Sequence, residues 1–263
     1  MTQRIENTFK KLKEQKRTAL IPFIMGYDPD GETSVKILSS LPAAGADIIE
    51  IGMPFSDPMA DGAVIQAAGL RALKAGGTVA KIIDMVREFR KEDSETPIIL
   101  MGYFNVVYCY GVKEFCDDAV AAGVDGIILV DLPPEEEEEI RPHLTTSGLN
   151  LIRLIAPTSD DNRVKLLSES ASGFVYYISV AGITGAKTAD SDSLKSQVEN
   201  LRRFTKLPIA VGFGIKTPRQ ANDVSRFSDA VVVGSALVDT IYKADDKIKA
   251  AKDFIYSLKA ALN

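Results

Sequence analysis

The 263 residues carry 31 Lys and Arg against 36 Asp and Glu, a formal net charge of −5, and 46% of them are hydrophobic. This apolar fraction is ample for a full core, and the mixed, mildly acidic charge argues against a surface for nucleic acid or an anionic membrane. Cys109 and Cys116 form no CxxC motif and fit a reducing compartment, and no apolar run reaches the roughly 18 residues of a membrane span. We therefore expect one domain, residues 1–263, that carries out small-molecule chemistry or contacts other proteins without binding a metal, in the cytoplasm or, for a processed chain, in the plastid stroma.

In chain order, buried apolar strands alternate with helices. Thr2–Lys16 places Ile5, Phe9 and Leu12 at helical spacing, which predicts an amphipathic helix. Eight strands are predicted at Ala19–Met25, Asp47–Gly52, Pro97–Gly102, Gly126–Asp131, Leu151–Ala156, Phe174–Val180, Pro208–Gly212 and Ala230–Gly234. Helices are predicted at Ser34–Ala44, Ala63–Lys74, Val79–Lys91, Val112–Ala122, Glu135–Thr146, Asp160–Ser170, Leu194–Thr205, Pro218–Arg226, Ala236–Tyr242 and Lys247–Leu262.

This alternation predicts an α/β fold. Continuous Ile, Val and Leu runs between helices indicate parallel strands that are covered on both faces. Eight such units in about 250 residues are typical of the (β/α)₈ TIM barrel, here with an additional N-terminal helix closing the bottom of the barrel. A doubly wound open sheet is the competing fold, and the absence of GxGxxG after the first strand argues against it.

The stretch Asp47–Gly62 carries two carboxylates in unlike surroundings. Side chains alternate along a strand, so Glu50 shares a face with Ile48 and Gly52 and is flanked by apolar groups. Lost hydration raises the pKa of such a carboxyl, which can then hold or donate a proton near neutral pH. Asp61 follows on a loop at the same strand end, where substrate can reach it. This pattern predicts divided acid and base roles; the alternative is a buried ion-pair partner and a helix cap.

Three glycine-rich turns follow the last three predicted strands. They are Gly182-Ile183-Thr184-Gly185, Gly212-Phe213-Gly214-Ile215 and Gly234-Ser235-Ala236. Glycine lets backbone N–H groups approach an anion closely, and barrels often hold phosphate after strands seven and eight. The segment Val180–Ser193 is longer than a typical connection and predicts a lid over the substrate, with a merely disordered loop as the alternative.

Adjacent tyrosines mark the sixth predicted strand. Tyr176 and Tyr177 face opposite ways, so only one looks into the barrel, where Glu50 could accept its hydroxyl. Arg153, in the fifth strand, could instead pair with Glu50. The single histidine, His143, lies on a charged helix surface, which argues against a Ser-His-Asp mechanism.

Five side chains at strand ends could form an apolar slot for an aromatic ring, and each also fits an ordinary core. They are Phe23, Met101, Tyr103, Leu129 and Phe213. The run Glu135–Glu139 is interpreted as a solvated helix start favoured by the helix dipole.

Four segments together resemble the α subunit of tryptophan synthase. They are Ala19–Phe23, Glu50–Gly62, Ala181–Gly185 and Gly212–Ile215. The resemblance implies a (β/α)₈ barrel that cleaves indole-3-glycerol phosphate to indole and glyceraldehyde 3-phosphate without a cofactor of its own. It also implies a β-subunit partner in an α₂β₂ complex, which receives the indole and joins it to serine with pyridoxal phosphate.

The resemblance also implies roles for individual residues. Glu50 matches the proton-transfer carboxylate, Asp61 the second carboxylate near the indole nitrogen, and Tyr176 the tyrosine beside the glutamate. Substrate contacts are expected from Phe23, Met101, Tyr103, Leu129, Thr184 and Phe213, and phosphate contacts from Gly185, Gly214, Gly234 and Ser235. Ala63 and Val106 stand where the family commonly has proline, in or beside loops expected to meet the β subunit.

Three rival functions share the barrel. One is a freestanding lyase that releases indole, and another is an isomerase of phosphosugars without an indole ring. The third is a chain that only activates its partner, against which the presence of Glu50 and Asp61 argues.

Overall fold

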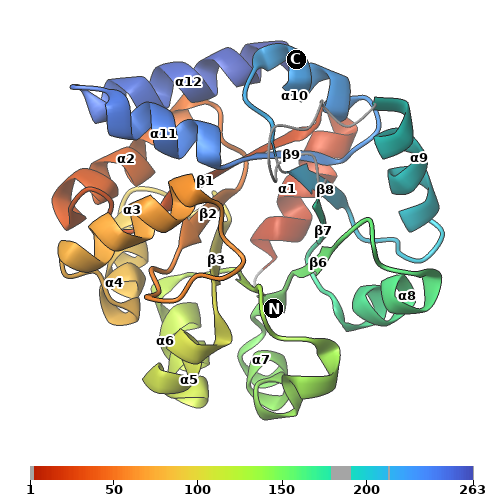
Figure 1. The fold of residues 1–263 in the computed structure, drawn as a ribbon, viewed down its shortest axis with the longest axis horizontal. Coiled ribbons are helices and arrows are strands. Elements are labelled where there is room, and N and C mark those ends of the chain that lie inside the picture. Colours follow the sequence, from red (N-terminus) through yellow and green to blue (C-terminus); the bar gives the residue numbers. More distant parts are fainter. Residues whose placement is uncertain (1–2, 179–190, 213, 263) are drawn as a thin grey trace.

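A computed structural model gives the fold of the protein, and the residues that it describes are 3–178, 191–212 and 214–262. A ring of parallel strands lies at its centre with helices around it (Figure 1). The strands are β1 (Ala19–Met25), β2 (Ile49–Gly52), β3 (Ile98–Gly102), β4 (Gly126–Leu129), β5 (Asn150–Leu151), β6 (Arg153–Ile155), β7 (Val175–Ile178), β8 (Ile209–Gly212) and β9 (Ala230–Val233). Their order is β5-β4-β3-β2-β1-β9-β8-β7-β6. Since Ile152 alone separates β5 from β6, the two ends of the sheet meet in one stretch of chain and the barrel is completed.

Helices surround the barrel. They are α1 (Arg4–Glu14), α2 (Gly31–Ala44), α3 (Ala63–Lys74), α4 (Val79–Phe89), α5 (Phe104–Tyr110), α6 (Val112–Ala122), α7 (Arg141–Ser147), α8 (Asp161–Ser170), α9 (Ser191–Leu201), α10 (Pro218–Ser225), α11 (Ser235–Lys243) and α12 (Lys247–Ala261), with a 3₁₀ helix η1 at Pro134–Glu139. The predicted α/β barrel is confirmed. No helix in the described ranges is long and apolar enough to cross a membrane.

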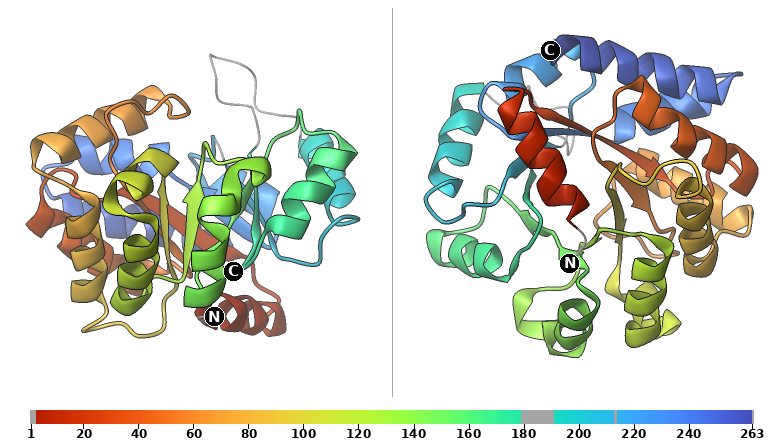
Figure 2. Two further views of the ribbon diagram at one scale, coloured as in Figure 1. Left: turned by 90° about the horizontal axis from the view of Figure 1, so that it is seen from below. Right: turned by 180° about the vertical axis from the view of Figure 1, so that it is seen from behind.

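The N-terminal helix closes one end of the barrel. Figure 2 shows α1 beneath the strands in the side view and across the end of the barrel in the view from behind. Its apolar face, Ile5, Phe9 and Leu12, is buried with the side chains of the barrel interior. The Phe9 ring packs against Phe174 with 5.9 Å between centroids, so the predicted plug is confirmed.

Strand alternation divides the core into two parts. Ile48 belongs to the interior cluster, whereas Ile49 and Ile51 pack outward with the surrounding helices. Glu50 lies on the same strand face as Ile48, which points into the barrel, and is 1% exposed. The chain therefore directs this carboxylate into the barrel.

Three local predictions were wrong. Helix α5 was not predicted, because Phe104–Tyr110 is rich in aromatic and β-branched residues and lacks an apolar period. The predicted fifth strand is split at Ile152, which pairs with β4 before Arg153 pairs with β7. The predicted helix Glu135–Thr146 is divided at Ile140 into η1 and α7.

Candidate active site

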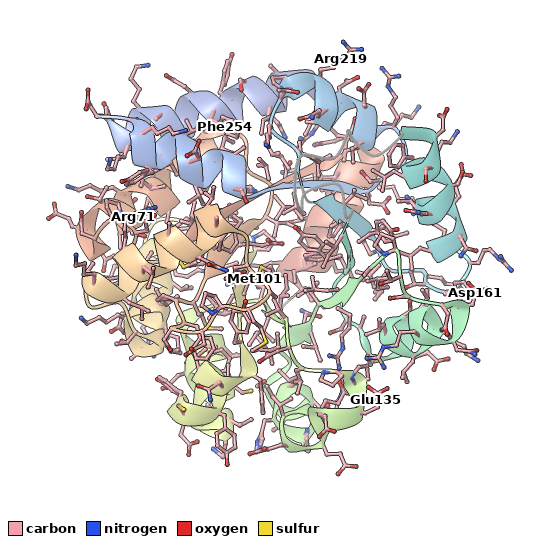
Figure 3. All side chains as sticks on the ribbon, in the orientation of Figure 1. Arg71, Met101, Glu135, Asp161, Arg219 and Phe254 are labelled. Carbon is pink, nitrogen blue, oxygen red and sulfur yellow. The ribbon has the colours of Figure 1, made fainter. Side chains whose placement is uncertain are left out.

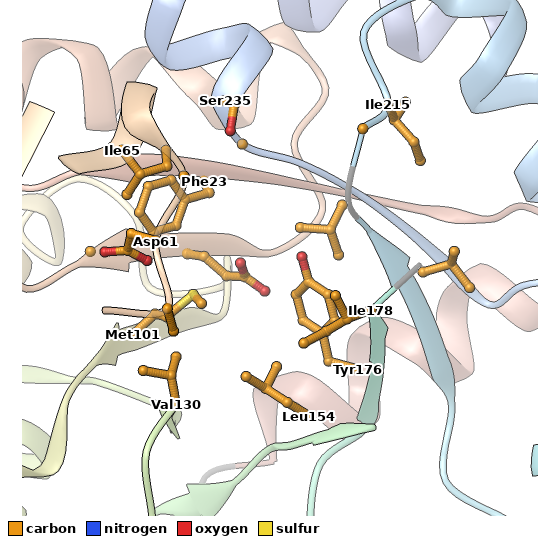
Figure 4. A pocket seen from close by; sticks show the side chains of 18 of the residues that line it. Phe23, Asp61, Ile65, Met101, Val130, Leu154, Tyr176, Ile178, Ile215 and Ser235 are labelled. Carbon is orange, nitrogen blue, oxygen red and sulfur yellow. The ribbon is translucent and has the colours of Figure 1, made fainter. Parts of the chain in front are cut away.

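A cavity of about 1550 Å³ opens at the carboxyl ends of the strands. Figure 3 shows Met101 near the centre of the ring, whereas Arg71, Glu135, Asp161, Arg219 and Phe254 lie around the periphery. In Figure 4, Asp61 and Tyr176 lie on opposite sides of the opening. Ten of the predicted site residues line the cavity: Phe23, Glu50, Asp61, Met101, Tyr103, Leu129, Tyr176, Gly214, Gly234 and Ser235. This end of the barrel is where (β/α)₈ enzymes carry their active sites.

Glu50 is a nearly dry carboxyl on the cavity wall. Its Oε1 atom is buried, with no hydrogen-bond partner among the residues that the structure describes. Burial raises the pKa of Glu50 from 4.5 to about 8, because water no longer stabilises the charged form. At neutral pH this group therefore holds its proton and can donate it.

Asp61 lies at the rim in a more polar setting. Partial burial raises its pKa to about 6, and a hydrogen bond from the Tyr103 hydroxyl opposes this rise. The same hydroxyl accepts the backbone N–H of Ala60 at 2.9 Å. Asp61 is therefore mostly ionised at neutral pH, while Glu50 is mostly protonated.

The two tyrosines of β7 take opposite sides of the sheet. Tyr176 belongs to the interior cluster, lines the cavity and is 6% exposed. Burial, followed by the nearby charge of Glu50, raises the pKa of Tyr176 well above its usual value. Tyr177 points outward and donates to Gln197 Oε1 at 2.5 Å. The tyrosine beside Glu50 is thus Tyr176.

Two strand-end turns present backbone to the cavity. Gly214 has φ +84°, a conformation that favours glycine, and a Cβ there would meet nothing within 4 Å. Gly234, Ser235 and Ala236 line the same cavity at the start of α11, and among the described residues no side chain caps this helix. The first N–H groups of α11 can therefore bind an anion.

Comparison with known proteins gives one consistent family. The model of the tryptophan synthase alpha chain family matches residues 9–262. The tryptophan synthase alpha chain of Granulibacter bethesdensis is 55% identical over 247 residues, which cover 94% of this chain and 89% of the relative. This chain belongs to the tryptophan synthase alpha chain family.

Solved structures of the family agree with this assignment. Tryptophan synthase subunit alpha from Legionella pneumophila str. Paris matches with a TM-score of 0.93 and 42% identity, covering 98% of each chain. A chain of tryptophan synthase from M. tuberculosis, in an aminoacrylate-bound form, matches with a TM-score of 0.90 and 30% identity, covering 99% of each. As a tryptophan synthase alpha chain, the protein is a carbon–carbon lyase of tryptophan biosynthesis that cleaves indole-3-glycerol phosphate to indole and glyceraldehyde 3-phosphate. This excludes the isomerase and the non-enzymatic activator.

The structure rejects the two non-catalytic interpretations of the carboxylates. Arg153 pairs with Glu137 and not with Glu50. Asp61 does not cap α3, since Gly62 is the N-cap residue and no described side chain caps that helix. Neither carboxylate of this tryptophan synthase alpha chain is therefore explained by a structural ion pair or a cap.

The run of glutamates was only partly interpreted correctly. Glu137 is half-buried and pairs with Arg153 and Arg141, and Glu135 pairs with Arg163. These ion pairs tie η1 to β6, α7 and α8, so the run is not simply a solvated helix start.

Some site residues were missed, and others fall outside the described ranges. Residues 184, 185 and 213, predicted as Thr184, Gly185 and Phe213, lie outside them, as does most of the predicted lid. Additional apolar side chains on the cavity wall are Met25, Ile65, Leu154, Ile178 and Val232. Strand alternation alone could have indicated three of these, because Leu154, Ile178 and Val232 lie two residues from Ile152, Tyr176 and Ala230 on the same strand faces.

Proposed function

We propose that Glu50 and Asp61 divide the acid–base work of the lyase, with Glu50 as the proton donor to the indole ring. The observation that carries this proposal is the buried Glu50 carboxyl beside a large cavity, whose Oε1 has no hydrogen-bond partner among the described residues and whose pKa is raised to about 8. A group that is protonated at neutral pH and whose pKa lies near 7 is suited to general acid catalysis.

The proposed reaction returns Glu50 to its starting state. The protonated carboxyl donates to C3 of the indole ring, which leaves a carboxylate and an indoleninium cation. That carboxylate then accepts the proton of the C1′ hydroxyl, and the C1′–O bond becomes the carbonyl of glyceraldehyde 3-phosphate. The electron pair of the C3–C1′ bond returns to the ring and restores neutral indole.

Asp61 stabilises the cation between these two steps. Its ionised carboxylate accepts a hydrogen bond from the ring N1–H, which carries developing positive charge after C3 is protonated. Tyr176 supports Glu50 by donating its hydroxyl to the carboxylate while that carboxylate exists; its pKa, raised partly by the Glu50 charge, is consistent with their proximity.

The rest of the cavity binds the two ends of the substrate. Phe23, Met101, Tyr103 and Leu129 provide apolar contacts for the indole ring, since all four line the cavity. Gly214, Gly234 and Ser235 provide backbone donors for the phosphate. The family resemblance adds Thr184 and Phe213 to the substrate contacts and Gly185 to the phosphate contacts.

We further propose that the chain works with a tryptophan synthase β subunit in the cytoplasm, in an α₂β₂ complex. Family membership supports a β-subunit partner, and the structurally similar chain from M. tuberculosis comes from a structure of tryptophan synthase. Pyridoxal phosphate then belongs to the β subunit, and the alpha chain needs no cofactor. In the described residues no group of three or more His, Cys, Asp or Glu side chains could hold a metal ion.

An indole-release assay with and without added β subunit tests this proposal. The isolated chain should form indole from indole-3-glycerol phosphate, and the β subunit should increase the rate. Indole formation that is unchanged by a saturating β subunit would favour the freestanding lyase. Turnover that survives Asp61→Asn unchanged would refute the role given to Asp61.

A further inference from the structure

Arg153 carries a buried guanidinium that the reaction itself does not use. The side chain is 3% exposed, and each of its three nitrogens donates to a protein acceptor. Nη1 donates to the Leu132 carbonyl at 2.7 Å, Nε donates to Ser170 Oγ at 3.1 Å, and Nη2 pairs with Glu137. Although Arg153 lines the cavity, this geometry does not suit a phosphate ligand, because its donors are directed at protein groups.

These bonds hold the loop between β4 and η1. Leu132 is in the middle of that loop, Glu137 is in η1, and Ser170 is the last residue of α8. Arg153 therefore joins three separate segments around one buried cation. A buried ion pair is often no more stabilising than a well-packed apolar side chain, so fixing the position of the loop explains this arrangement better than stability does.

The loop in turn is bonded to the next strand end. Asp131, the neighbour of Leu132, accepts the Phe104 backbone N–H on Oδ1 at 2.7 Å. Phe104 directly follows Tyr103, whose hydroxyl accepts the N–H of Ala60, the residue before Asp61, at 2.9 Å.

A continuous chain of contacts thus crosses the mouth of the barrel. It begins at β6, passes through the loops that follow β4 and β3, and ends on the loop that follows β2. Since β2, β3 and β4 are adjacent in the sheet, the steps from the loop after β4 onward join neighbouring strand ends. A shift of the loop after β4 would therefore be passed to Tyr103 and Asp61.

We propose that Arg153 is a positioning residue for the lyase, which fixes the loop after β4 and thereby holds the Tyr103 hydroxyl on the backbone of Ala60, next to Asp61. This inference rests on the role of Asp61 proposed above. Arg153 does not touch the reacting atoms; it acts through Asp131, Phe104 and Tyr103.

A double-mutant cycle tests the connection. Arg153→Met should lower kcat for indole release about 10-fold to 100-fold, because small displacements of a reacting group have effects of that size. The KM should change much less, since the proposed phosphate donors at Gly214 and Gly234 are not part of this chain of contacts. In a Tyr103→Phe background, Arg153→Met should lower kcat by no more than about twofold. Arg153→Lys, which keeps one donor for the Leu132 carbonyl, should restore part of the activity.

Arg141→Met is the matched control. Arg141 shares Glu137 with Arg153 and donates to the carbonyl of Ser170 at 2.9 Å, but among the described residues no hydrogen bond or ion pair joins it to the loop after β4. Any effect of replacing Arg141 should be confined to a lower melting temperature, and kcat should be unchanged. If Arg153→Met fails to fold, Asp131→Ala removes the next contact in the series, the hydrogen bond to Phe104. Its effect on kcat must also be non-additive with that of Tyr103→Phe.

Two outcomes overturn the inference. One is a folded Arg153→Met protein whose kcat is within about twofold of the parent. The other is a double variant, Arg153→Met with Tyr103→Phe, whose loss of kcat equals the product of the losses in the two single variants. Asp61→Asn separates this failure from failure of the proposed function. If Asp61→Asn is inactive and the effects of Arg153→Met and Tyr103→Phe are additive, only the role of Arg153 is refuted. If Asp61→Asn is active, the role of Asp61 is refuted.

Discussion

Replacing Glu50 by glutamine should make the chain more stable and much less active. Glutamine has the size of the protonated glutamic acid and cannot ionise, so it preserves the packing of a side chain that is 1% exposed. It also removes the cost of keeping an acid protonated at neutral pH. The two readouts, stability and turnover, depend on the same raised pKa.

The stability change has a definite dependence on pH. Below pH 4.5 the Glu50 carboxyl is protonated in both the folded and the unfolded chain, so it adds no pH-dependent penalty. Between pH 4.5 and about 8 the unfolded chain releases this proton and the folded chain keeps it, so stability falls by about 1.4 kcal/mol per pH unit. At pH 7 the penalty reaches about 3 kcal/mol. The free energy of unfolding of Glu50→Gln should therefore exceed that of the parent by about 3 kcal/mol at pH 7 and equal it near pH 4.5.

Denaturant unfolding across this pH range measures the first readout. The control is Glu139→Gln, the same chemical change at an exposed glutamate, which should leave the pH dependence of stability unaltered. A gap between Glu50→Gln and the parent that stays constant from pH 4.5 to 7 would show that the carboxyl is not held protonated by the fold.

An indole-release assay measures the second readout. Loss of a general acid should lower kcat by about 10²-fold to 10⁴-fold, while the KM changes little because the ring and phosphate contacts remain. Near-normal turnover in a folded Glu50→Gln protein would refute the proton-transfer role. A loss of activity accompanied by a large rise in the KM would mean that Glu50 mainly binds the substrate.

Two further results are expected. The pH profile of kcat/KM should be bell-shaped, falling below about pH 6 as Asp61 is protonated and above about pH 8 as Glu50 loses its proton; a profile flat across this range would contradict the paired assignment. Gly214→Asp should chiefly raise the KM, because it places a negative charge beside the proposed phosphate donors. The control is Gly76→Asp, which imposes a similar backbone strain, with φ +81° against +84°, away from the cavity and should leave the KM unchanged. If both variants raised the KM equally, the phosphate would have to bind elsewhere.

The barrel was predictable because its strands are locally unambiguous. Ile48–Ile51 and the similar runs of the other strands are buried on both faces of the sheet, and most of these runs are followed by a helix with a clear apolar period. Helix α5 was not predictable in this way. Its first N–H, on Phe104, is capped by Asp131 from a different loop, so the start of this helix depends on tertiary structure that no local pattern reports.

The site was predictable to the extent that strand alternation determines it. Glu50 follows from its apolar neighbours, but the choice between Tyr176 and Tyr177 requires the position of the sheet relative to the barrel axis. The partner of Arg153 requires still more, because a strand residue can pair inward or outward. Its pairing with Glu137 depends on how η1 folds back over β6, which the sequence does not specify locally.

The distribution of buried acids explains why Glu50 is suited to the proposed proton transfer. Among the described residues, three acidic side chains are buried, and two of them have arginine partners: Asp28 is bonded to Arg71 and Asp125 to Arg90. Glu50 has a buried oxygen with no described hydrogen-bond partner. An ion pair would lower its pKa and abolish its capacity to hold a proton at neutral pH. The other two buried carboxylates of the described residues are thus paired, whereas Glu50 is not, and the same lack of compensation that lowers stability keeps this carboxyl protonated at neutral pH, as the proposed proton donor requires.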